Sequence, residues 1–154
     1  MNIKKRKIMK RILLTLVAIF SVGVFVAVAD NDKVINKNQL PAQAQQFINT
    51  HFAGVELTYA KQERDVFDRS YEVMLANGAK LEFTANGSWE EVDCRYGEVP
   101  ADVVPAAIKK YVDEKFAGEK VIGIERHRNE IEVRLSNRFE LTFNKDYKLV
   151  DIDD

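Results

Sequence analysis

A helix-length pattern of apolar and polar positions occurs twice in the chain, at a constant offset of 64 residues. The first copy runs from Leu40 to Gly54 and the second from Val104 to Gly118, and each begins next to a proline and ends at a glycine. Within each copy the apolar residues recur at helical spacing and the polar residues lie opposite them. Each copy therefore predicts an amphipathic helix with one face to bury.

Four strand-length segments follow each predicted helix. Apolar and polar residues alternate with a period of two in most of them, as in a half-buried strand. Asn77-Gly78 and Asn86-Gly87 are typical of tight hairpin turns. The predicted strands are 55–63, 71–75, 79–83 and 89–93 in the first half, and 121–126, 131–135, 139–143 and 148–153 in the second.

The two halves also match residue by residue. Aligned at an offset of 60, segments 71–93 and 131–153 share seven identical residues in 23, against the roughly one or two expected from average composition. The offset falls from 64 to 60 between the helix and the second strand, which makes Asp65-Val66-Phe67-Asp68 the surplus residues of a longer first hairpin.

These patterns predict an α+β fold made of two tandem helix-plus-four-strand repeats. One helix covers one face of four strands and leaves the other face open. Side by side, the repeats would form one eight-stranded antiparallel sheet with both helices on one face. The expected boundaries are a flexible lead-in at 30–39, a first repeat at 40–93, a connection at 94–103 and a second repeat at 104–154.

The amino terminus has the pattern of a secretory signal peptide. Six basic residues precede an apolar run from Ile12 to Ala29 that ends in Ala27-Val28-Ala29, the small-x-small pattern of a cleavage site. We expect cleavage after Ala29 and a periplasmic protein that is not held at a membrane. A retained anchor is the alternative, because 18 apolar residues just reach a spanning length.

Cleavage would make the protein acidic. Removing six basic residues from 23 leaves 17 against 24 acidic residues, a net charge of −7. A nucleic-acid partner is therefore not expected, since phosphate binding needs clustered Lys and Arg. Cys94 is the single cysteine, so no disulfide can form within one chain, and a buried thiol, an intermolecular bridge or a reactive thiol are the alternatives.

Alternation assigns a broad set of polar side chains to the open face of the sheet. A protein partner would contact this face, and the expected contact residues are Glu72, Met74, Trp89, Glu132 and Arg134. Trp89 belongs to this set only if strand 89–93 is regular. A β-bulge would move it to the helix side, into the core or the sheet edge.

The hairpin around Phe67 is a second candidate contact. Phe67 lies between Asp65 and Asp68, and an aromatic side chain on an extended hairpin can anchor a partner. Alternatively, Val66 and Phe67 fold back onto the sheet.

Acidic residues recur at equivalent strand ends of the two halves. Alternate strand residues point the same way, so Glu91 with Asp93, and Asp151 with Asp153, could each offer two oxygen ligands to Ca²⁺. The spacing is not that of an EF-hand. The alternative is a solvated acidic edge that discourages pairing between sheets. No other cofactor is expected.

No arrangement of residues indicates catalysis. A nucleophile needs a base within hydrogen-bond reach, and the possible thiol pairings are Cys94 with His51 or His127. We expect His51 at the solvent boundary of the first helix and His127 in a charged hairpin. The protein is therefore expected not to be an enzyme.

Several motifs resemble those of the PepSY-like periplasmic proteins formerly called DUF2874. They are the proline-led helix, the hairpin strand Tyr71–Asn77, the strand segment Leu81-Glu82-Phe83 and the turn Gly87-Ser88-Trp89. The resemblance covers residues 40–154. It implies a fold like that of the secreted β-lactamase inhibitor protein, with a binding or inhibitory role, but these motifs shape the fold and carry over no contact residue.

Two functions are therefore expected. The first is a non-catalytic exported binding module, such as an inhibitor or regulator of a periplasmic hydrolase or protease, that uses the open face and the Phe67 hairpin. The alternative is a periplasmic sensor that responds to calcium or to a small ligand near Trp89.

Overall fold

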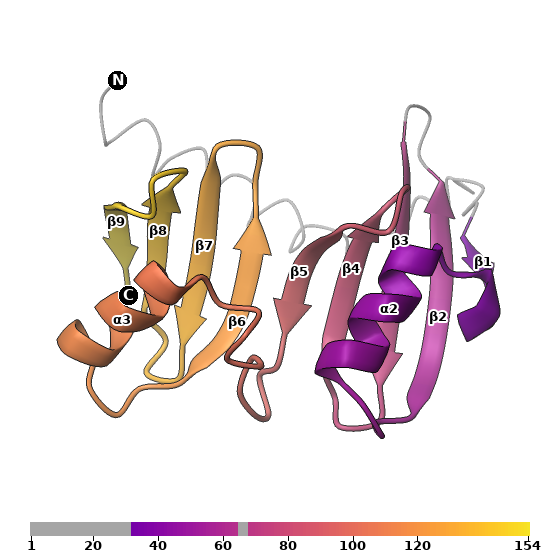
Figure 1. Ribbon diagram of the computed structural model, residues 1–154, viewed down its shortest axis with the longest axis horizontal. Coiled ribbons are helices and arrows are strands. Elements are labelled where there is room, and N and C mark those ends of the chain that lie inside the picture. The colour runs from indigo at the N-terminus through magenta and orange to yellow at the C-terminus, as the bar shows by residue number, and fades with distance from the viewer. Residues whose placement is uncertain (1–31, 65–67) are drawn as a thin grey trace, which may run out of the picture. The chain divides into compact units, whose positions relative to one another are not determined.

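A computed structural model describes residues 32–64 and 68–154, which belong to one compact unit, Asn31–Asp154. This part of the chain forms one nine-stranded sheet in sequential order, in which each strand is antiparallel to its neighbours (Figure 1). The strands are β1 Lys33–Val34, β2 Leu57–Arg64, β3 Arg69–Leu75, β4 Lys80–Thr84, β5 Trp89–Asp93, β6 Val121–Arg126, β7 Glu130–Leu135, β8 Glu140–Asn144 and β9 Leu149–Asp153.

Two ten-residue helices precede their groups of strands, α2 at Ala42–His51 and α3 at Ala106–Lys115. Pro41 and Pro105 occupy the N-cap positions, one residue before the helices begin. Gly54 and Gly118 follow the helices with φ of 78° and 87°, the left-handed conformation that ends helices at glycine. Among the described residues, no helix has both the length and the apolar character needed to cross a membrane.

One row of side chains forms the apolar core of the sheet. Directly paired residues on neighbouring strands point to the same face, and such pairs connect Ala60, Val73, Leu81, Val92, Ile124, Val133 and Leu141. Each is at most 1% exposed. Full burial of one such aliphatic side chain contributes about 1.5–3 kcal/mol. The row crosses β2 to β8 without interruption, so the strands of both halves share one core.

Aromatic contacts hold each helix to its strands in the same way. Phe47 of α2 contacts Phe83 of β4 edge-on, with ring centroids 5.7 Å apart, and Tyr111 of α3 contacts Phe143 of β8 edge-on at 5.6 Å. Phe83 and Phe143 are fully buried. Edge-to-face packing adds about 0.5–1.5 kcal/mol beyond area burial, so these pairs fix the position of each helix on its strands.

The predicted eight-stranded sheet is wrong by one strand. Residues 30–39 were expected to be a flexible lead-in, yet Lys33 and Val34 form β1 and pair with Gln62 and Lys61 of β2. Residues 30–39 are mainly polar and show no strand pattern. They can still form a strand, because backbone pairing does not depend on side-chain polarity. Ile35, which follows directly, is buried with 8% exposed. A short 3₁₀ helix at Lys37–Gln39 then leads to Leu40.

The junction between the two groups of strands is the pairing of β5 with β6. Three residue pairs form it, Glu91 with Glu125, Val92 with Ile124 and Asp93 with Gly123. The position of Gly123 requires glycine because the Arg134 side chain passes close to it. A Cβ there would lie 2.6 Å from the Arg134 guanidinium, so the missing side chain gives Arg134 of β7 the room to cross β6 and reach β5.

Two hairpin turns of the second half place ordinary residues where the first half has glycine. Arg138 and Tyr147 have φ of 76° and 56°, whereas Gly78 and Gly87 have φ of 83° and 89° in the matching turns. Residues with a Cβ are strained in this conformation.

We expect Arg138→Gly to raise the free energy of unfolding by about 1 kcal/mol, because glycine removes the left-handed strain. Urea denaturation of residues 30–154 measures the change. Gly78→Ala is the matched control and should lower stability, since its Cβ would also lie 2.8 Å from the Tyr96 ring. A lower stability of Arg138→Gly would contradict this account of the turn.

Candidate functional site

A row of mainly acidic side chains crosses the face opposite the apolar row. The pairing register connects these residues directly from β2 to β9. Like charges directly opposite one another destabilise a sheet, so cations must lie nearby. In order, the row is Lys61, Glu72, Glu82, Glu91, Glu125, Glu132, Thr142 and Asp151. We call this face the acidic face.

Lys80 and Arg134 neutralise the centre of the acidic face. The Lys80 Nζ lies 2.8 Å from both Glu82 Oε1 and Glu91 Oε2. The Arg134 guanidinium donates a 2.8 Å hydrogen bond to the other Glu91 oxygen. Burial lowers the pKa of Lys80, but the hydrogen bonds to Glu82 and Glu91 outweigh it and leave that pKa raised. Glu91 is therefore held between two cations.

Lys61 forms a similar cluster at the β1–β2 end of the face. It pairs with Glu63, with Asp32 at 3.2 Å and with Glu72 at 3.8 Å. The hydrogen bond to Glu63 is the main cause of its raised pKa. Salt bridges of this half-exposed kind contribute little to stability singly, but as a network they fix the side chains in a defined pattern of charge.

Asp93 lies at the end of β5 and is almost fully buried, with 2% exposed. Arg95 Nη2 donates a 2.6 Å hydrogen bond to its Oδ2, and Arg134 Nη1 lies 3.5 Å from the same oxygen. Burial raises the pKa of Asp93, but Arg95 and Arg134 outweigh it and hold that pKa below its usual value.

The expected calcium ligands divide into two groups in the structure. Glu91 and Asp93 each form an ion pair with a cation of their own, and Arg134 contacts both carboxylates. Asp151 and Asp153 lie on the edge strand β9, opposite Thr142 and Glu140. The oxygens of the first pair would have to leave their cationic partners in order to bind a metal.

Four expected contact residues lie together on the acidic face. Glu72 is opposite Glu82, Met74 is opposite Lys80, and Glu132 and Arg134 are their counterparts on β7. All four are half-buried by their neighbours.

Trp89 is a correction to the expected contact set. A bulge at Glu90 of β5, between the pairs Glu82–Glu91 and Phe83–Trp89, places Trp89 opposite Phe83, on the apolar side. Its ring lies 6.0 Å from Phe47 of α2 and 3.8 Å from the guanidinium carbon of Arg126. The bulge inserts an extra residue and reverses the alternation. Trp89 therefore does not line the acidic face.

The expected contacts in the Phe67 hairpin fall mostly outside the described residues. Asp65 and Phe67 lie there, while Asp68 is described and accepts a 2.7 Å hydrogen bond from the Arg69 backbone N–H. Asp68 also lines a polar surface depression with Asp32, Glu63, Arg64, Ser70 and Glu90.

Cys94 has the environment of a buried structural thiol. It is 6% exposed, and burial together with Asp93 raises the pKa of its thiol to about 11. A thiol with this pKa is a poor nucleophile at neutral pH.

The two histidines that were candidate bases for Cys94 lie beside carboxylates. His51 Nδ1 lies 2.9 Å from Asp102 Oδ2, and His127 lies beside Glu125 and Glu132.

Sequence reasoning missed a cluster formed by Glu125, His127 and Glu132. His127 Nε2 lies 3.6 Å from Glu125 Oε1 and 3.6 Å from Glu132 Oε2. Burial raises the pKa of Glu125; His127 lowers it, and Glu91 and Glu132 raise it further. The signal was present in the hairpin Glu125–Glu132, because alternation places Glu125 and His127 on one side and the register brings Glu132 opposite.

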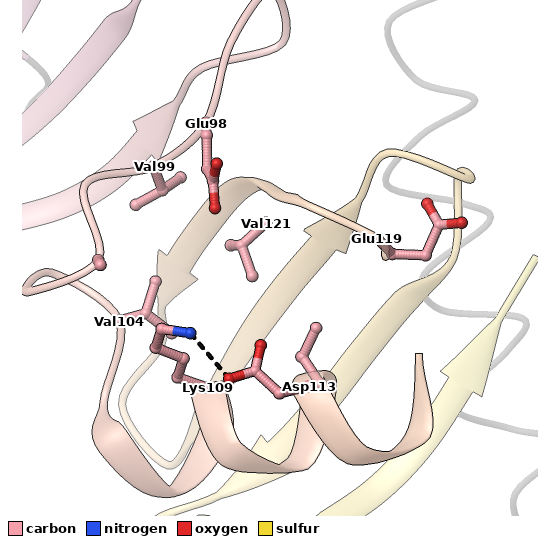
Figure 2. A pocket seen from close by; sticks show the side chains of 9 residues that line it. Glu98, Val99, Val104, Lys109, Asp113, Glu119 and Val121 are labelled. Carbon is pink, nitrogen blue, oxygen red and sulfur yellow. Dashed lines mark hydrogen bonds and ion pairs between the residues drawn. The ribbon is translucent and has the colours of Figure 1, made fainter. Parts of the chain in front are cut away.

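A small cavity lies between α3, the connection and β6 (Figure 2). Its volume is about 30 Å³, and it is lined by Glu98, Val99, Ala101, Val104, Lys109, Val112, Asp113, Glu119 and Val121. This is room for about a water molecule or two and is far below the size of ordinary ligand sites. The acidic face is the larger functional candidate.

Comparisons with known proteins identify relatives. Residues 69–151 match a family described as "Putative beta-lactamase-inhibitor-like, PepSY-like". Among curated proteins, none matches this chain.

Three solved structures from Bacteroides resemble the chain over most of its length. A putative periplasmic DUF2874 protein from Bacteroides vulgatus ATCC 8482 is 49% identical, with a TM-score of 0.79 over 82% of this chain and 99% of that chain. A "putative calcium-regulated periplasmic protein" from Bacteroides thetaiotaomicron is 48% identical, with a TM-score of 0.80 and the same coverage. A second putative periplasmic protein of B. vulgatus, of unknown function, is 38% identical, with a TM-score of 0.76 over 80% of this chain and 99% of that chain.

Asp93→Asn should lower the free energy of unfolding by about 1–2 kcal/mol at pH 7, because it removes charge-assisted hydrogen bonds. An aspartate with a lowered folded-state pKa stabilises the protein above its unfolded pKa, and this contribution is lost as the pH falls through the folded pKa. The difference between wild type and variant should therefore shrink below about pH 4.

Urea denaturation of both proteins from pH 7 to pH 3 measures this dependence. Asp113→Asn is the control, because Asp113 forms an exposed pair with Lys109 on α3, and it should have little effect at any pH. An Asp93→Asn deficit that stays constant down to pH 3 would show that the charge of Asp93 is not its source.

Proposed function

Because this chain belongs to the PepSY-like, β-lactamase-inhibitor-like family, we propose that it is a non-catalytic exported module that binds and restrains a periplasmic hydrolase or protease. The acidic face is the proposed binding surface. The family description and the periplasmic neighbours support an exported protein of this kind. Export would use the leader at 1–29, which lies outside the described residues.

The observation that carries the proposal is the pattern of charge on the acidic face. Lys61, Lys80 and Arg134 hold glutamates in fixed positions across neighbouring strands. A rigid surface loses little side-chain entropy on binding, which favours affinity. A complementary pattern of charge on a partner would then provide specificity and fast association.

The finer architecture is part of the proposal. We infer two tandem helix-plus-four-strand repeats, with α2 and α3 both covering the apolar side and leaving the acidic face free. Support comes from the equivalent pairs Phe47–Phe83 and Tyr111–Phe143. Equivalent bulges directly after Trp89 and Leu149 add to it.

The test is inhibition of defined enzymes by residues 30–154. Exported β-lactamases and proteases from a Bacteroides periplasm would be assayed with and without the protein, and binding would be measured by surface plasmon resonance. We expect inhibition of at least one hydrolase. Glu82→Lys should weaken its binding at least about tenfold, because it reverses one charge at the centre of the surface.

Glu114→Lys is the matched control for Glu82→Lys, with the same charge change on α3, where Glu114 lies 3.8 Å from Lys110. It should leave binding unchanged. Equal losses from both variants would show that net charge and not the acidic face governs binding. No binding to any enzyme of the panel would count against the inhibitor function.

The second candidate function is a calcium-responsive sensor. It rests on the relative described as calcium-regulated, at 48% identity, and on Asp151 and Asp153 at the β9 edge. Glu91 and Asp93, the other expected pair, would have to leave their cationic partners in order to bind calcium.

Calcium at about ten times its Kd should stabilise the protein by about 1.4 kcal/mol, which a thermal melt would detect. Sites of extracellular modules bind with Kd of about 10⁻⁴–10⁻³ M, so the titration extends to about 10 mM. Asp151→Asn should abolish the response and Asp113→Asn should retain it. A melt that is unchanged by calcium would remove this candidate.

A further inference from the structure

The Glu125, His127 and Glu132 cluster has the geometry of a metal site. Glu125 and Glu132 are directly opposite on β6 and β7, and His127 follows the end of β6. One ligand atom from each side chain lies within 4.8 Å of the other two. In a tetrahedral site with metal–ligand bonds of about 2.0–2.1 Å, neighbouring ligand atoms are about 3.4 Å apart. The two 3.6 Å separations from His127 Nε2 are already near this value.

The sheet around the cluster concentrates negative charge. Glu91 on β5 is directly opposite Glu125, so three glutamates occupy consecutive positions across β5, β6 and β7. Glu91 is neutralised by Lys80 and Arg134. Directly opposed like charges cost stability, and a divalent cation bound by both Glu125 and Glu132 would reduce that cost.

The ligand set selects the kind of metal. Two carboxylates with one imidazole suit Zn²⁺ and similar first-row ions. Ca²⁺ instead takes six to eight oxygen ligands. We propose that Glu125, His127 and Glu132 bind a divalent transition-metal ion of the Zn²⁺ class, with a fourth position open to water or to a side chain of another molecule. This inference stands whether or not the acidic face inhibits a hydrolase.

The test is titration of residues 30–154, without an affinity tag that contains histidine, with ZnCl₂ by calorimetry and with CoCl₂ by visible absorption. We expect one equivalent of Zn²⁺ to bind and Co²⁺ to give a visible band that Zn²⁺ displaces. His127→Ala and Glu132→Gln should each weaken Zn²⁺ binding at least about tenfold, since loss of even an outer partner costs about 10–100-fold.

His51→Ala is the matched control, because His51 also lies beside a carboxylate, that of Asp102. It should bind Zn²⁺ as the wild type does, and so should Cys94→Ser. Melting curves without metal establish that each variant is folded. The proposal is overturned by three results: no binding of Zn²⁺, binding that survives His127→Ala, or loss of binding in His51→Ala. A fourth contrary result would be a site that binds Ca²⁺ more tightly than Zn²⁺ and still binds both ions in His127→Ala.

Discussion

The pairing of β5 with β6 joins the two groups of strands into one sheet. It is short, with three residue pairs, and the backbone extends it through Cys94 N–H to Ile122 O at 2.7 Å and Val99 N–H to Val121 O at 2.8 Å. Val92 and Ile124 are fully buried at its centre and keep the apolar row continuous. Without this pairing, each group of strands would expose an unpaired edge and part of its core.

Two arginines strengthen this junction from opposite sides. Arg134 crosses over Gly123 to Glu91 and Asp93 on the acidic side. Arg126 covers the Trp89 ring and donates a hydrogen bond to the Trp89 carbonyl. Each reaches from the second group of strands to β5. Charge-assisted hydrogen bonds are among the stronger polar contacts in proteins. The two arginines therefore add stability to the short backbone pairing of β5 with β6.

Helix spacing, period-two alternation and Asn-Gly turns were sufficient to predict the helices, eight of the strands and the polar character of one face, because these signals are local. The ninth strand was missed since β1 is only two residues long and lies in a mainly polar segment. The sequence left two positions open for Trp89, because a bulge depends on how two strands pair, which one strand's sequence does not reveal.

The candidate site was predictable only in part for the same physical reason. Alternation placed Glu72, Met74, Glu132 and Arg134 on one face of the sheet. It could not show that Arg134 reaches across Gly123, because the two residues are eleven positions apart in sequence and meet through the β6–β7 register. The cluster around His127 likewise depends on which residue faces Glu125 across the hairpin.

The crossing of Arg134 over Gly123 sets a limit on how this protein can change over evolutionary time. The guanidinium that holds the junction together also lies on the acidic face. A molecule that recruits this group competes with Glu91 and Asp93 for it. Mutations that strengthen such recruitment would therefore weaken the fold, the general trade-off between stability and function. Substitutions on the acidic face therefore disturb the fold least at positions away from this arginine.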